Sequence, residues 1–121
     1  MKRLYIIGMM IVALLLPTVT QAADAKTTSE VCWREGISSY EAKNYSEAVK
    51  CFEQIVELGY GSADVYYNLA NSYFKLGETL YNEGGRKFSG GELGRAVLNY
   101  HRALRENPAM EDARYNLELA V

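Results

Sequence analysis

The feature that most restricts the fold of this chain is a recurrence of residues at a fixed interval. The triplet Tyr-Asn-Leu at 67–69 returns at 115–117. A longer pattern, in which a large residue, an alanine and an aromatic residue are spaced in the same way, occurs at 45–52 and again at 93–100. Because both pairs have the same offset, they indicate repeated structural units rather than isolated coincidences.

A shorter interval relates the beginning of the two units, since Gly36 corresponds to Ala70. One unit is therefore about 34 residues long, and the next has the same length plus an insert at about 78–91. Small residues at fixed positions allow two helices to approach closely. A period of this length with paired helices predicts an all-α fold, and an open α-solenoid rather than a closed bundle.

The breaks between the expected helices are marked by glycine and proline. Glycines gather at 59–61 and at 84–94, and Pro108 is the only proline after Pro17. Capping-box patterns at Thr27 and Ser89 indicate two helix starts. The predicted helices cover about 28–42, 44–58, 62–81, 90–106 and 109–121.

These small and aromatic residues resemble the tetratricopeptide repeat (TPR), which implies helix-turn-helix units in a short right-handed solenoid. In the second unit the pattern is carried by Tyr66, Leu69, Ala70, Tyr73, Ala96, Tyr100, Ala103 and Pro108. The first unit keeps Gly36, Ala48 and Phe52, but has Ser39, Ile55 and Tyr60 where the pattern has an aromatic residue, a small residue and a proline. The resemblance divides residues 29–121 into unit one (29–62), unit two (63–110, which contains the insert) and the first helix of a third unit (110–121).

Segments 68–77, 92–104 and 111–118 are also similar to the TPR component of Bat-type aerotolerance operons. That likeness implies a role in tolerance of oxidative stress, in a complex of the cell envelope. Those proteins usually continue into membrane segments and an SH3-like domain, whereas this sequence stops at Val121. Helix 109–121 then has no second helix to cover it, so we expect either a fragment or another chain, such as a second copy, on that face.

Residues 1–22 have the order of a secretory signal peptide. Two basic residues precede an apolar run at 4–16, and Pro17 and a small-residue stretch follow it. The run has 13 residues, fewer than the roughly 20 that a spanning helix needs, although an uncleaved anchor is the alternative. Cleavage is expected after Ala22 or after Ala25. We therefore expect an exported chain, periplasmic or associated with the inner membrane.

The charges and the reactive residues exclude several classes of function. Removal of residues 1–22 takes away two basic residues and no acidic one, which moves the net charge from −2 to −4. A negative chain is a poor ligand for nucleic acid. His101 is the only histidine, and no spacing is typical of a catalytic constellation or a metal site. We expect a non-enzymatic protein without catalytic residues, cofactor or metal.

The first helix of each TPR unit lines the concave side, so the resemblance also predicts a groove for a protein or peptide partner, itself membrane-associated. Aromatic side chains provide contact area at small entropic cost, and an Asn amide can pair with both backbone groups of a peptide. The alternative is that neighbouring repeats bury these aromatic residues. The predicted groove consists of Trp33, Ile37, Tyr40, Tyr67, Asn68, Asn71, Phe74, Lys75 and Tyr115. Trp33 stands where a carboxylate-binding TPR has Lys, so no carboxylate clamp is expected.

Three further features have two interpretations each. The glycine-rich insert carries Arg86, Lys87 and Phe88, which form either a second contact for the partner or part of a plain surface loop. The spacing of its glycines matches no nucleotide-binding pattern.

Cys32 and Cys51 are expected to face each other across the first helix pair, either as a disulfide or as two buried thiols. Residues 109–121 either continue the groove or mediate self-association.

Overall fold

The computed structural model of the chain describes residues 2–84 and 91–121, with side chains for 21–83 and 91–121. These residues form five α-helices and contain no strand, which confirms the prediction of an all-α fold. The helices are α1 (Lys2–Glu41), α2 (Tyr45–Glu57), α3 (Ala63–Gly84), α4 (Glu92–Glu106) and α5 (Glu111–Ala120).

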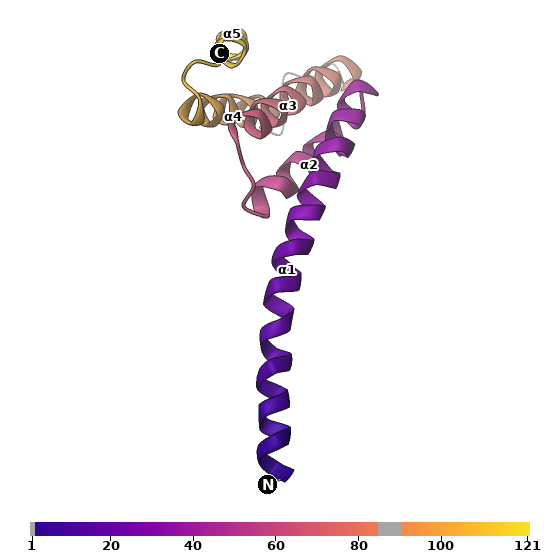
Figure 1. Cartoon of the computed structure of the whole chain (residues 1–121). Coiled ribbons are helices and arrows are strands. Elements are labelled where there is room, and N and C mark those ends of the chain that lie inside the picture. The colour runs from indigo at the N-terminus through magenta and orange to yellow at the C-terminus, as the bar shows by residue number, and fades with distance from the viewer. Residues whose placement is uncertain (1, 85–90) are drawn as a thin grey trace.

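The helices stack in the order of the sequence (Figure 1). Each helix packs on the one before it and the one after it, and α3 also contacts α1 and α5. Within the described ranges, α1 approaches neither α4 nor α5. The arrangement is therefore open at both ends, as in a solenoid, and the N-terminal half of α1 projects away from the other helices (Figure 1).

Most helix boundaries follow the residues that predicted them. Gly59 has a φ of 88° and ends α2, because glycine adopts this left-handed conformation without a steric penalty. Ser62 caps α3, since its Oγ accepts a hydrogen bond from the Val65 N–H at 3.2 Å. Gly91, with a φ of 83°, precedes α4. Ser89, the expected cap of that helix, lies outside the described residues.

The predicted start of the first helix is wrong. We expected Thr27 to cap a helix that begins at residue 28, but α1 passes through this position without a break. The Thr27 hydroxyl donates to the carbonyl of Ala23 at 3.1 Å, so it bonds backward inside the helix instead of capping it. The flanking segment 22–26 contains three alanines, which favour a helix. The removal of residues 1–22 as a signal peptide stays a prediction.

The core is built around the recurring small residues. Ala48, Ala70, Ala96 and Ala103 have no exposed surface. Gly36 is also buried, and a Cβ at this position would lie 2.7 Å from Cε1 of Phe52. This contact shows how closely α1 and α2 approach, which only a residue without a side chain permits. The small residues therefore set the helix spacing, as the repeat predicted.

Candidate functional site

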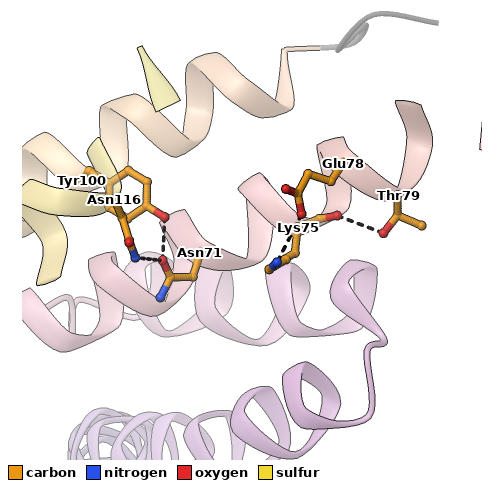
Figure 2. A network of polar contacts seen from close by, with 6 residues as sticks. All are labelled: Asn71, Lys75, Glu78, Thr79, Tyr100 and Asn116. Carbon is orange, nitrogen blue, oxygen red and sulfur yellow. Dashed lines mark hydrogen bonds and ion pairs between the residues drawn. The ribbon is translucent and has the colours of Figure 1, made fainter. Parts of the chain in front are cut away.

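A polar network joins three helices around the side chain of Asn71. The Oδ1 atom of Asn71, on α3, accepts a hydrogen bond of 2.5 Å from the Tyr100 hydroxyl on α4. The same oxygen accepts one of 3.0 Å from the Asn116 amide on α5 (Figure 2). The Asn116 amide also donates to the Tyr67 hydroxyl at 3.3 Å. A single carbonyl oxygen therefore connects α5 to both helices of the preceding unit.

Tyr100 is the buried member of this network. Its side chain is 1% exposed. Burial is the largest cause that raises the pKa of Tyr100, and the nearby phenols of Tyr67 and Tyr40 raise it further. The hydroxyl therefore stays protonated at neutral pH and serves Asn71 as a donor.

A groove runs along the same side of α3, and we call it the inner groove. Its first hollow has a volume of about 280 Å³ and is lined by Tyr40, Tyr67, Asn71, Phe74, Lys75, Tyr100, Asn116 and Leu119. A second hollow, of about 460 Å³, is lined by Phe74, Glu78, Tyr81, Asn82, Leu93, Leu119 and Ala120. Because Phe74 and Leu119 line both hollows, the groove continues from α1 across α3 to α5.

Lys75 is the basic residue of the inner groove. Its Nζ atom lies 3.2 Å from Oε2 of Glu78, one helical turn further along α3 (Figure 2). The hydrogen bond to Glu78 raises the pKa of Lys75. Both side chains are partly exposed, and an ion pair of this kind contributes about 1 kcal/mol or less. The amine can therefore change its partner at little cost when a ligand enters.

The side chain of Asn71 retains one hydrogen-bonding group, its amide NH₂, for a ligand. We expected its amide to pair with both backbone groups of a peptide, but its oxygen is already used by Tyr100 and Asn116. Figure 2 shows the amide nitrogen directed away from these two residues. Asn71 is thus arranged to donate to a ligand carbonyl and not to accept from a ligand N–H, because a neighbouring helix occupies its oxygen.

The structure brings together five of the nine residues predicted to form the groove. The members that line the inner groove are Tyr40, Tyr67, Asn71, Phe74 and Lys75. The members that do not line it are Trp33, Ile37, Asn68 and Tyr115.

Each residue outside the groove has a different surrounding. Ile37 packs against the core. Asn68 donates to the carbonyl of Asp64 in its own helix at 2.8 Å. Tyr115 is 63% exposed. Trp33 lines a separate hollow, with its ring centroid 5.8 Å from that of Phe52. These four residues therefore line neither hollow of the inner groove, and their role in partner binding stays a prediction.

Tyr100 lines the inner groove but was not predicted from the sequence to do so. It lies on the second helix of its unit, and the resemblance placed only first helices at the groove. A comparison of the two units could have indicated this role, because the position of Tyr100 is occupied by Phe52 in unit one. The hydroxyl that distinguishes Tyr100 from Phe52 is the group that reaches Asn71.

The two cysteines are free thiols in the structure, of which Cys32 is buried and Cys51 is half-buried. The Cys32 thiol donates to Oε1 of Gln54 at 3.3 Å, which places it beside the last turns of α2. Burial raises the pKa of both Cys32 and Cys51.

Other predicted features give little further information. Arg86, Lys87 and Phe88 lie outside the described residues. Among the residues that the structure does describe, no cluster of His, Cys, Asp or Glu has the arrangement of a metal site. In the same part of the chain, no helix combines the length and apolarity needed to cross a membrane.

The fold and the groove place the chain in the class of helical-repeat proteins, in which stacked helix pairs form an extended inner surface. Its sequence is similar to that of the photosystem I assembly protein Ycf3 of Synechococcus sp. strain WH7803. The two are 31% identical over 105 residues, which cover 87% of this chain and 52% of the relative. The Ycf3 protein of strain CC9605 is 32% identical over 89 residues, or 74% of this chain and 45% of the relative.

The chain thus spans about half the length of the curated relatives it matches. No protein-family model matches the sequence. No solved structure matches it either.

Proposed function

We propose that this chain is a TPR scaffold that binds a segment of a protein partner in the inner groove. The observation that carries the proposal is the groove itself, in which four aromatic side chains line one hollow: Tyr40, Tyr67, Phe74 and Tyr100. Aromatic residues in a concave surface supply most of the binding energy in many protein interfaces. The relatives are named as assembly proteins, which supports a role in bringing subunits of a complex together.

The chemistry of the groove favours an extended segment with an apolar side chain. Phe74 and Leu119 form the apolar passage between the two hollows. The Asn71 amide nitrogen is placed to donate to a backbone carbonyl of that segment, and Lys75 offers a positive charge at the same hollow. Such a groove fixes the register of a bound strand by polar contacts and gains affinity from the aromatic contacts.

The finer part of the proposal concerns location. We propose that the chain is exported and works in the cell envelope with a membrane-associated partner, in a complex for aerotolerance. The support is the basic, apolar and small-residue order of residues 1–22 and the resemblance to Bat-type proteins. Fractionation of cells that produce the chain, followed by N-terminal mass analysis, tests the location. A chain recovered with Met1 from the cytosol alone would contradict it.

Capture of the partner tests the groove. The chain, cross-linked in envelope fractions, is compared with Phe74→Ala and Tyr40→Ala variants, and we expect both variants to lose most of the captured partner. Leu98→Ala is the matched control, because Leu98 is an exposed apolar residue of α4 outside both hollows. Circular dichroism establishes that each variant is folded. Equal capture by folded Phe74→Ala and by the unchanged chain would overturn the proposal.

A second candidate function is self-association through residues 109–121. Three large apolar residues at the end of the described fold are exposed: Tyr115 by 63%, Leu119 by 61% and Val121 by 84%. Exposed apolar residues that lie together often mark an interface. Sedimentation at increasing protein concentration separates the two functions, since self-association raises the mass and Tyr115→Ser with Leu119→Ser lowers it again. A constant monomer mass would exclude this function.

A further inference from the structure

A second hollow lies apart from the inner groove, and we call it the outer hollow. It has a volume of about 420 Å³ and is formed by α1, the end of α2, the turn that follows and the start of α3. It shares no lining residue with either part of the inner groove. Its residues are Ser29, Glu30, Trp33, Arg34, Ile55, Tyr60, Ser62, Asp64 and Val65.

Two of the three residues in which unit one departs from the repeat, Ile55 and Tyr60, line this hollow. Trp33, Ile55 and Tyr60 all line it. The corresponding residues of unit two are Tyr67, Ala103 and Pro108, which are smaller in each case. Ile55 belongs to the buried core and Trp33 packs against that core. Tyr60 is 42% exposed, so it is the large side chain of this hollow that helix packing does not explain.

The aromatic side chains of the hollow are accessible. Tyr60 is 42% exposed and lies in the turn between α2 and α3. The Trp33 ring packs edge-on against Phe52, and it also lines the hollow. The hollow thus offers two aromatic rings above a base formed by Ile55 and Val65, which are both buried.

The charges around the hollow are unequal. Glu30 and Asp64 contribute two carboxylates, and Arg34 contributes one guanidinium. Within the described ranges, the ion pairs are those of Lys50 with Glu47 and of Lys75 with Glu78, so none of these three side chains is in one. The carboxylates are therefore available to a cation from outside, and the lining has a net negative charge.

We infer that the outer hollow binds an arginine side chain, flanked by apolar residues, of a protein partner. A guanidinium stacks on aromatic rings and pairs with carboxylates, so Trp33 and Tyr60 suit its plane and Glu30 and Asp64 suit its charge. The aliphatic part of the arginine and its apolar neighbours lie against the base of the hollow. This site goes beyond the proposed function, because it does not use the inner groove.

The single tryptophan makes the hollow directly observable, because Trp33 is the only one in the chain. The full chain is titrated with the peptide acetyl-Leu-Arg-Leu-amide, and its intrinsic fluorescence is recorded. Two matched peptides replace the arginine by norleucine, which keeps the stem without the charge, and by glutamate. We expect a saturable change with the arginine peptide that falls as salt is added, and a much weaker response to the other two. An equal response to all three, or no saturable change with the arginine peptide, would overturn the inference.

Two variants are expected to have effects of opposite sign, a third is a control, and all of them retain Trp33. Glu30→Gln with Asp64→Asn is expected to weaken binding of the arginine peptide by about three- to tenfold, the combined effect of losing two partly exposed ion pairs. Arg34→Gln removes the competing cation and is expected to tighten binding. Glu118→Gln, on α5, is the control for net charge and should leave the affinity unchanged. A weaker complex with Arg34→Gln, or an unchanged one with the double variant, would contradict the assignment.

Discussion

The Tyr100 hydroxyl on α4 donates to Oδ1 of Asn71 on α3 across 2.5 Å. The same oxygen holds Asn116, so the contact connects the helix pair of one unit to the first helix of the next. Apolar packing spaces the helices but is non-directional, whereas the two hydrogen bonds to this oxygen are directional and orient α5 on α3 and α4. The inner groove depends on this orientation, because Leu119 of α5 lines both of its hollows.

Removal of the Tyr100 hydroxyl is therefore expected to destabilise the fold. Tyr100→Phe keeps the ring and loses one buried hydrogen bond, which lowers the free energy of unfolding by about 0.5–1.5 kcal/mol. The control is Tyr115→Phe, because Tyr115 is mostly exposed. Urea unfolding followed by circular dichroism measures both variants. A Tyr100→Phe protein as stable as the unchanged chain would show that this hydrogen bond makes no net contribution to the free energy of unfolding.

Two helical glycines should respond in opposite ways to replacement by alanine. Gly36→Ala places a Cβ 2.7 Å from Cε1 of the fully buried Phe52, and overpacking of this kind costs about 1–3 kcal/mol. Gly94 in α4 has open space at the same atom, so Gly94→Ala gains about 0.5–1 kcal/mol of helix propensity. Thermal unfolding of the two variants compares them. Stabilisation by Gly36→Ala would contradict the close approach of α1 and α2.

Residues whose role is local were predictable from the sequence. Gly59 ends α2 and Ser62 begins α3 because each acts through its own backbone or its own cap. Ala48 and Ala70 were assigned to helix contacts by the repeat pattern and its resemblance to the TPR, and both are fully buried. The order and type of the helices follow from such residues.

Residues whose role depends on the residues that surround them in the fold were not predictable from the sequence. Thr27 has the pattern of a cap, but the preceding segment is helical and the cap is not needed. Trp33 shares a repeat position with Tyr67, yet the two line different hollows. A repeat pattern fixes the position of a Cα on a helix, whereas the cavity that a side chain lines depends on the sizes of its neighbours, such as Ile55.

The two thiols are expected to react slowly and at different rates in the folded chain. The thiolate is the reactive form, and burial raises the pKa of Cys32 and of Cys51. Cys32 is buried and Cys51 is half-buried, so Cys51 should react with iodoacetamide first. Mass spectrometry of peptides after timed alkylation gives the order. A denatured chain that takes up no label before reduction would contain a disulfide and contradict the free thiols.

Alkaline pH should destabilise the fold through its buried tyrosines. Burial and the hydrogen bond to Glu53 raise the pKa of Tyr73, and burial raises the pKa of Tyr100. The unfolded chain ionises these phenols near a pKa of about 10, whereas the folded chain keeps them protonated. Their contribution to stability is therefore complete below that pH and is lost as the pH rises above it.

Urea unfolding at a series of pH values from 8 upward measures this loss, and tyrosinate absorbance follows the ionisation directly. The ion pair of Lys75 with Glu78 weakens with the same sign, because the folded chain raises the pKa of Lys75. Tyr73→Phe with Tyr100→Phe separates the contributions, since it removes the two phenols and leaves the ion pair. The double variant should be less stable at pH 8 and lose less stability as the pH rises. Parallel pH profiles for the variant and the unchanged chain would show that neither phenol is protected by the fold.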